Sequence, residues 1–272
     1  ERRLYESLAL LLERSRPQLQ RLIEDHETQR QARRQAGQRL IAELLIDCAA
    51  CRRSVAAQPV LEQGAISELR DAIRQREQRC VEALLRLYAF RSSDAKAADL
   101  PLLDGRWGDD LFNPETLKQL GIKVGGGMAA GAATGVGVDL LVGGLTLGAA
   151  AALGAVIGGS AQTLRNYGER LKGKLKGQRE LTVDDAVLRL LALRQQQLLA
   201  ALDIRGHAAM DAITLNAPQE TLWRQGKLPA PLNVARAHPE WSSLNPGARL
   251  EEADRAEQVE RLRGDLAMQS VG

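Results

Sequence analysis

The chain has 272 residues, of which 44% are hydrophobic, 26% charged and only 3% aromatic. A chain of this length can bury a sizeable core, and with few aromatic residues Leu and Ala must supply it, which favours helices over β-rich architectures. The formal net charge of +3 is too small to indicate a nucleic-acid-binding protein from totals. Cys48, Cys51 and Cys80 form no framework spacing, so we expect a reducing compartment rather than a disulfide scaffold.

The N-terminal third predicts helices. Pro17 separates a short first helix from a long one over 18–57, because proline restricts the residue before it. The middle of the long helix, DHETQRQARRQAGQR, is almost wholly polar, so we expect it to be solvent-exposed or to lie against another domain. Pro59 and Gly64 mark a turn before a third helix over 65–90. The two long helices are expected to form an antiparallel hairpin.

Further helices are indicated along the rest of the chain. Asn113 and Pro114 predict a helix start, with Asn as the cap and Pro at the first helical position. Thr182 and Asp185 resemble a capping box that opens a long helix. The Pro/Trp-rich segment 216–247 is expected to wrap the surface in an ordered way, followed by a charged last helix. Its expected anchors are Trp223, Leu228, Leu232 and Trp241. We expect no strand anywhere.

These elements predict an all-α fold with a long helical hairpin, a central glycine-zipper helical hairpin and C-terminal helices. We divide the chain into three parts. Residues 1–92 are the long amphipathic hairpin, which would link the chain to a preceding domain. Residues 93–180 are a loop, the glycine-rich apolar hairpin and its basic exit. Residues 181–272 are the C-terminal helix, the Pro/Trp wrap and the charged tail helix.

A Gly/Ala-rich apolar tract in the middle of the chain is its most unusual feature. Between Lys123 and Arg165 the only charge is Asp139, which divides the tract into an arm over 124–138 and an arm over 140–164. At 1.5 Å per residue, a helix over the second arm is long enough to cross a hydrocarbon core of about 30 Å. The first arm would be a marginal span.

Small residues in the tract recur at four-residue spacing, which lets helix backbones approach closely. The glycines concerned are Gly127, Gly131, Gly135, Gly144, Gly148, Gly154 and Gly158. We therefore expect a helical hairpin bent near Asp139, with both ends on one side. It could associate with or enter a membrane, or be buried in a soluble bundle. Asp139 counts against a fully spanning hairpin, because the carboxyl group would have to cross the bilayer or be protonated.

The tract ends in a basic segment over 165–179, which holds six basic residues against Glu169 alone. A basic cluster beside an apolar segment attracts anionic lipid headgroups and favours the cytoplasmic side. The residues predicted to bind headgroups or an acidic partner are Arg165, Arg170, Lys172, Lys174 and Lys176.

No catalytic or metal-binding constellation is apparent. Gly173 and Lys174 complete a G-x-x-x-x-G-K pattern, but Leu175 replaces the hydroxyl residue that binds Mg²⁺, and no strand is expected before it. Cys48 and Cys51 form C-x-x-C on a helix, which favours a core role over zinc binding. We therefore expect no enzyme activity, no cofactor and no metal in this chain.

Three stretches together carry a family resemblance: LFNPETLKQLGIKVGGGMAAGAATGVGVDLLVGGLTLGAAAALGA, GGSAQTLRNYGERLKGKLKGQRELTVDDAVLRLLALRQQQLLAALDIRGHAAMDAI and KLPAPLNVARAHPEWSSLN. The chain resembles the bacterial domain of unknown function 3482, which follows an Era-like P-loop GTPase domain in the same polypeptide. The resemblance covers nearly all of the chain. It implies that GTP and Mg²⁺ belong to a GTPase domain outside this chain, which itself starts without Met and lacks the GTPase motifs.

Two functions stay open at this point. The first is a non-catalytic helical effector domain of a bacterial GTPase, cytoplasmic or at the inner membrane, that associates with or inserts into membrane through the glycine-zipper hairpin. Its expected partners are its own GTPase domain in cis and an anionic membrane, with homo-oligomer formation open. The alternative is a soluble helical protein-interaction domain whose glycine hairpin is core. Nucleic-acid binding is disfavoured because the basic segment lacks interleaved aromatic residues.

Overall fold

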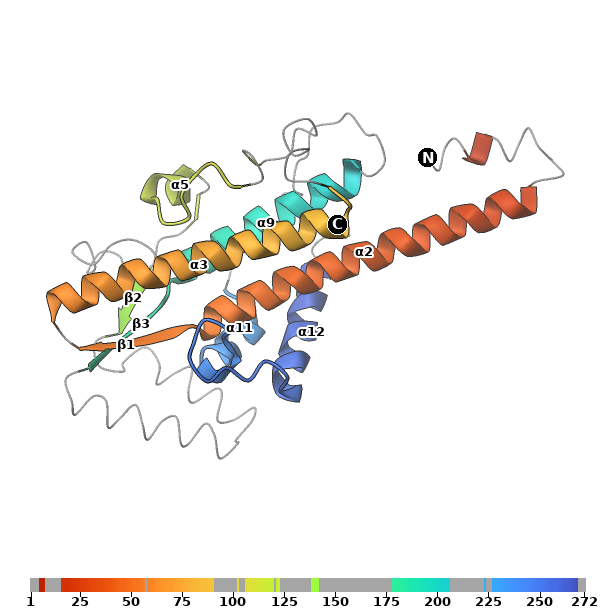
Figure 1. The fold of residues 1–272 in the computed structure, drawn as a ribbon. Coiled ribbons are helices and arrows are strands. Elements are labelled where there is room, and N and C mark those ends of the chain that lie inside the picture. The colour runs from red at the N-terminus through yellow and green to blue at the C-terminus, as the bar shows by residue number, and fades with distance from the viewer. Residues whose placement is uncertain are drawn as a thin grey trace.

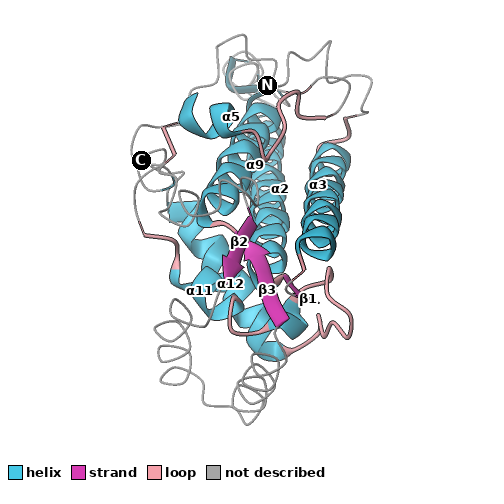
Figure 2. Ribbon diagram, turned by 90° about the vertical axis from the view of Figure 1, so that its left-hand side faces the viewer, coloured by secondary structure: helices cyan, strands magenta, loops and turns pink. Residues whose placement is uncertain are grey.

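The computed structural model describes residues 5–7, 16–56, 58–90, 102, 106–119, 121–122, 138–141, 178–205, 223 and 227–268. Within these ranges the chain is mostly helical and contains one small sheet (Figures 1 and 2). The predicted all-α class is therefore confirmed at the level of the overall architecture. The expectation of no strand is wrong.

The helical body is built from α2, α3 and α9, with shorter elements at the C-terminal end. α2 and α3 run antiparallel and contact each other, as predicted, while α9 packs against both of them and α12 packs across α2 (Figure 1). The helices are α2 Arg16–Ala50, α3 Pro59–Leu87, α5 Pro114–Gln119, α9 Asp185–Arg205, α11 Ala230–Ala235, the 3-10 turn η2 Pro239–Trp241 and α12 Ala253–Met268.

The core brings together helices that are far apart in the chain. Ile41 and Leu45 of α2 are fully buried together with Leu84 of α3 and Leu198 of α9. Gly37 lies where α2 meets α9, because a Cβ atom at this position would be only 2.5 Å from Cδ1 of Leu199. The Leu199 side chain therefore fills the space over Gly37 and would have to move if residue 37 carried a side chain.

Helix starts agree only in part with the expected caps. The Asn113 side chain accepts the backbone N–H of Glu115 at 3.0 Å, which confirms the predicted cap of α5. α3 begins at Pro59 rather than after Gly64, since the missing N–H of proline is no loss in the first turn. The capping box expected at Thr182 is wrong: Asp184 accepts the backbone N–H of Ala186 at 2.6 Å and caps α9 instead.

Three short strands form an antiparallel sheet in the order β1-β3-β2. They are β1 Arg52–Ala56, β2 Val138–Leu141 and β3 Gln178–Val183. The helix predicted over 18–57 thus ends at Ala50, and the chain continues as β1. The strand β1 pairs with β3, which lies more than a hundred residues further along the chain. The formation of β1 therefore depends on tertiary structure rather than on local propensity.

Candidate functional site

The residues that the sequence singles out for hairpin packing and headgroup binding lie outside the described residues. They are Gly127, Gly131, Gly135, Gly144, Gly148, Gly154, Gly158, Arg165, Arg170, Lys172, Lys174 and Lys176. In the part of the chain that is described, no helix combines the length and the apolar character needed to cross a membrane. Within the tract, the structure describes only the strand Val138–Leu141.

That strand corrects the expected geometry of the tract. Val138 pairs with Val183 and Leu141 with Glu180, which makes β2 one edge of the sheet. The helical bend predicted near Asp139 is therefore wrong, since Asp139 lies in an extended strand opposite Thr182. The physical reason is that β3 offers a hydrogen-bonding edge to the short apolar run around Asp139.

The sheet anchors the tract at several points. The segment 142–177 leaves from β2 and returns into β3, and these two strands are paired. If its 36 residues formed a helical hairpin, each arm would be at most about 27 Å long, shorter than a hydrocarbon core of about 30 Å. The segment 123–137 is likewise fixed at both ends, by the buried Ile122 and by β2. Chain length thus limits how far either segment can reach from the body.

Arg52 of β1 contacts both the sheet and the C-terminal part of the chain. It pairs with Thr182 in the ladder, so Arg52, Thr182 and Asp139 occupy one row across the three strands. The Arg52 guanidinium is only 7% exposed and donates to Glu180 at 3.0 Å. It also donates to the backbone carbonyl of Arg236. One arginine therefore connects β1, β3 and the C-terminal part of the chain.

A segment near the C-terminus, residues 236–245, covers the junction of α2 and β1, and we call it the C-terminal strap. Asn245 donates to the carbonyls of Ala50 at 3.2 Å and Pro239 at 2.8 Å, and it accepts the backbone N–H of Arg52 at 3.0 Å. Arg236 donates to the carbonyl of Val183 at 3.0 Å. The strap thus fixes the exit of α2 and the end of β3 simultaneously.

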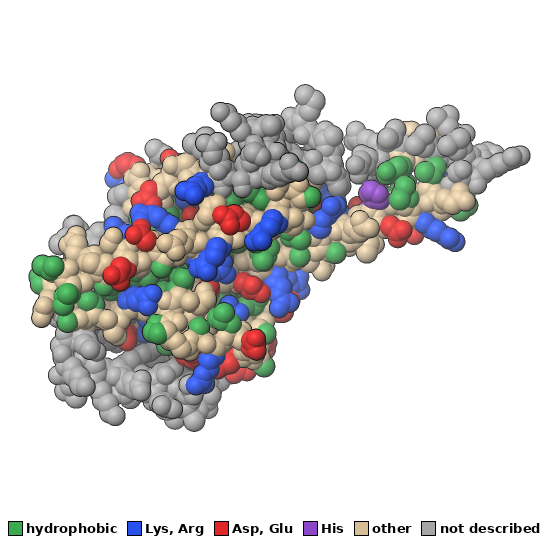
Figure 3. All heavy atoms as spheres, viewed as in Figure 1, with side chains coloured by type: hydrophobic (Ala, Val, Ile, Leu, Met, Phe, Trp, Pro, Cys, Tyr) green, Lys and Arg blue, Asp and Glu red, His purple; other side chains and the backbone are tan. Residues whose placement is uncertain are grey.

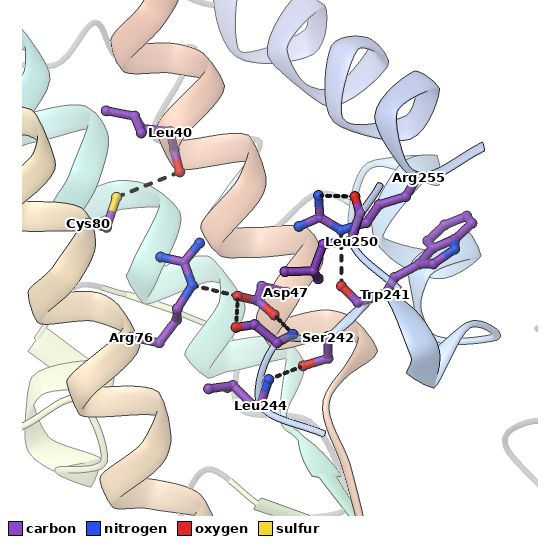
Figure 4. A network of polar contacts seen from close by, with 10 residues as sticks. Leu40, Asp47, Arg76, Cys80, Trp241, Ser242, Leu244, Leu250 and Arg255 are labelled. Carbon is purple, nitrogen blue, oxygen red and sulfur yellow. Dashed lines mark hydrogen bonds and ion pairs between the residues drawn. The ribbon is translucent and has the colours of Figure 1, made fainter. Parts of the chain in front are cut away.

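A buried carboxylate secures the strap to the helices (Figure 4). Asp47, 2% exposed, accepts hydrogen bonds from Arg76 at 2.5 Å and from the Ser243 hydroxyl at 2.7 Å. Nearby, Arg255 of α12 donates to the carbonyl of Trp241 at 3.0 Å. These contacts join α2, α3, α12 and the strap. They show why the C-terminal segment is ordered.

The expected anchors of the Pro/Trp-rich segment are all buried: Trp223, Leu228, Leu232 and Trp241. This confirms the predicted anchors within the described part of that segment. The hydrogen bonds of Asn245 and Asp47 add polar contacts that no sequence pattern indicates. Their partners lie almost two hundred residues away in the chain.

An ion pair ties the end of the basic segment to α3. Arg179, the second residue of β3, contacts Glu62 in the first turn of α3 at 3.1 Å. Glu62 is only 6% exposed, so the arginine neutralises an otherwise buried carboxylate. The basic segment therefore enters the sheet beside the N-terminus of α3.

Comparison with known proteins places the chain in a family. The model of the family described as "Domain of unknown function (DUF3482)" matches residues 1–264. The chain belongs to the DUF3482 family. No curated protein and no solved structure matches it. The family match includes the sheet, the glycine-rich tract and all described helices except the last four residues of α12, so the tract belongs to this DUF3482 domain as much as the core does.

The cysteines of this DUF3482 domain lie in its core. Cys48, Cys51 and Cys80 are buried and form no disulfide. Burial raises the pKa of Cys51 to about 11 and that of Cys80 to about 12, so these thiols stay protonated at neutral pH. Among the described residues, no group of three or more His, Cys, Asp or Glu side chains could hold a metal ion.

Two ionisable side chains of this DUF3482 domain, Asp110 and His238, have structural partners. Asp110 accepts two hydrogen bonds from Arg74, at 2.9 and 3.0 Å, and this contact lowers the pKa of the carboxyl group. His238 contacts Glu240 at 2.8 Å and stacks on the Trp241 ring with centroids 4.1 Å apart.

Proposed function

We propose that this chain is the non-catalytic helical effector domain of a bacterial GTPase, and that it associates with membrane through its glycine-rich tract. The GTPase chemistry, with GTP and Mg²⁺, would lie in a separate domain of the same polypeptide. One observation carries the proposal. α2 begins with an exposed, polar half and ends one residue before β1. β1 belongs to the same sheet as β2 and β3, the two strands that flank residues 142–177.

α2 is the element suited to transmit a change of state. Its 35 residues correspond to about 52 Å of helix, and its N-terminal half extends beyond the body (Figure 1). A domain that moved this half would act on β1 one residue after the helix ends. The ladder between β1 and β3 would pass that movement to β3, the strand in which the basic segment ends. The sheet thereby links the projecting helix to the tract.

The mode of membrane contact follows from charge and chain length. Lys172, Lys174 and Lys176 supply the positive charge that anionic headgroups attract. Because 142–177 begins and ends in paired strands, we favour shallow insertion at the headgroup level over a full crossing.

Flotation with vesicles tests this proposal. The chain should float with vesicles that contain anionic lipid at about 0.1 M salt, and much less at about 0.5 M, because salt screens the contact. Replacing Lys172, Lys174 and Lys176 with Glu should abolish flotation. The matched control replaces the exposed Arg16, Arg21 and Arg79 with Glu, which changes the net charge equally elsewhere. A wild-type chain that stays at the bottom at low salt would refute the proposal.

The alternative is a soluble protein-interaction domain, for which the exposed half of α2 would be the contact surface. The two functions differ in what surrounds the glycines. If the tract is protein core, Gly131→Leu should unfold the chain in plain buffer, whereas if it meets lipid the variant should stay folded without vesicles. Circular dichroism in the absence of lipid distinguishes these outcomes.

A further inference from the structure

The turn between β1 and α3 exposes apolar side chains to solvent. Val60 is 84% exposed and Leu61 is 51% exposed. Figure 3 shows hydrophobic side chains at this end of the molecule. Exposed neighbours of the pair are also uncharged, and we call the group the apolar tip. It consists of Gln58, Pro59, Val60, Leu61, Gln63 and Gly64.

The stretch of sequence that contains the apolar tip is poor in charge. In residues 54–67 the only charged side chain is Glu62, although 26% of the whole chain is charged. Glu62 is buried and bound to Arg179, so it adds no free negative charge to the surface. Moving the tip out of bulk water would therefore require the desolvation of no unpaired charge.

The apolar tip lies beside the entry of the basic segment. Arg179 belongs to the strand that directly follows 165–177, and its contact with Glu62 brings this strand to the first turn of α3. The tip is at the sheet end of the molecule, far from the N-terminal end of α2 (Figure 1). The chain that carries the basic segment therefore enters the sheet at the end where the apolar tip lies.

We infer that the apolar tip is a second membrane-contacting element, in which Val60 and Leu61 insert at the headgroup level of an anionic bilayer. This inference rests on the proposed function. A neutral apolar projection next to basic side chains is the combination that binds such a surface, because it joins apolar burial to attraction by the lipid charge. The occupant is a bilayer, since the chain that leads into Arg179 carries Arg170, Lys172, Lys174 and Lys176, whose charge an anionic lipid surface complements.

A fluorescent label at position 60 reports insertion directly. The three native cysteines are buried, so the thiol of Val60→Cys can be labelled selectively with a nitrobenzoxadiazole group in the full chain. Vesicles containing anionic lipid should shift its emission to the blue. The same label at Ala256→Cys, an exposed position on α12, should show no shift.

The second measurement removes the apolar groups. Replacing Val60 and Leu61 together with Ser should lower the partition coefficient into anionic vesicles at least about tenfold, given the apolar area these side chains would bury. Leu250→Ser is the matched control, because Leu250 is also an exposed hydrophobic residue, 41% exposed, on a different part of the chain. That control should bind like the wild type. Equal melting curves would show that the variants are folded.

The outcomes separate this inference from the function on which it rests. If the wild type does not float at all, both the proposed function and this inference are refuted. If the wild type floats but the double Ser variant floats equally and the label at position 60 does not shift, only the inference is overturned. A shift at position 60 that depends on protein concentration and not on vesicles would assign the tip to a second copy of the chain and would also overturn it.

Discussion

The two halves of α2 have different surroundings although they form one continuous helix. Residues 37–50 are mostly buried between α3, α9, α11 and α12, whereas none of the residues 16–36 is fully buried. The buried half carries the apolar contacts that hold the body together. The exposed half is polar on nearly all sides and extends past the body (Figure 1).

The difference shows how a helix can be extended without a core of its own. Starting a helix is costly and prolonging it is not, so the packed half can support the exposed one as its continuation. One anchor on the exposed half is Arg30, which contacts Asp203 of α9 at 3.0 Å. A projecting helix with few tertiary contacts is free to contact another domain, as the proposed function requires.

The largest difference between the halves is expected from their aspartates. Asp47→Ala should lower the free energy of unfolding by about 3–5 kcal/mol, because Arg76 and Ser243 would lose their buried partner. Asp25→Ala, in the exposed half, should change it by less than about 0.5 kcal/mol. Urea denaturation of both variants measures the contrast. Similar losses for the two would contradict the division of α2.

The boundary between the halves can be tested at Gly37. Gly37→Leu should lower the free energy of unfolding by about 1–3 kcal/mol, because its side chain would collide with Leu199. Gly64→Leu is the control: a Cβ atom there meets nothing within 4 Å, and helix propensity should raise stability by up to about 1 kcal/mol. Thermal unfolding compares the two, and a neutral Gly37→Leu would refute the tight packing of Leu199 against Gly37.

The contrast between buried and exposed charge extends to α3. Burial raises the pKa of Glu77 to about 7, although Arg194 and Gln195 act against this. Between pH 4.5 and pH 7 the folded chain keeps a proton that the unfolded chain has lost, so the free energy of unfolding should fall by about 1–3 kcal/mol as pH rises through this window.

Denaturation at several pH values checks this dependence. Glu77→Gln should remove the part of the slope that lies between pH 4.5 and pH 7, because glutamine does not titrate. Glu82→Gln, at an exposed position on the same helix, should leave the slope unchanged. An unaltered slope in Glu77→Gln would show that another group is responsible.

The smallest effect concerns the exposed half itself. Arg30→Ala should lower the free energy of unfolding by only about 0.5–1 kcal/mol, since the arginine is partly exposed. Amide exchange over 16–30 should nevertheless become faster, because the contact to Asp203 is lost. Arg21→Ala, which is exposed, is the control and should leave exchange unchanged. Equal exchange in both variants would show that Arg30 does not anchor this half.

Local sequence patterns predicted much of the helical fold. Apolar spacing located the buried end of α2 around Ile41 and Leu45, and Asn113 marked the start of α5. The strands were missed because β1 follows α2 with only one residue between them and has no proline or glycine to signal the change. The alternation of Leu181 and Val183 was the signal that could have indicated β3.

The sequence by itself determined that the chain is helical, that its middle is an apolar tract rich in glycine and that a basic segment follows. Composition and spacing carry that information locally. Only the tertiary structure decided that Asp139 lies in an edge strand, that Arg179 reaches Glu62 and that Asn245 closes the junction after Ala50. Each of these contacts joins residues far apart in the chain, and no local pattern specifies which distant partner a strand or a buried charge will find.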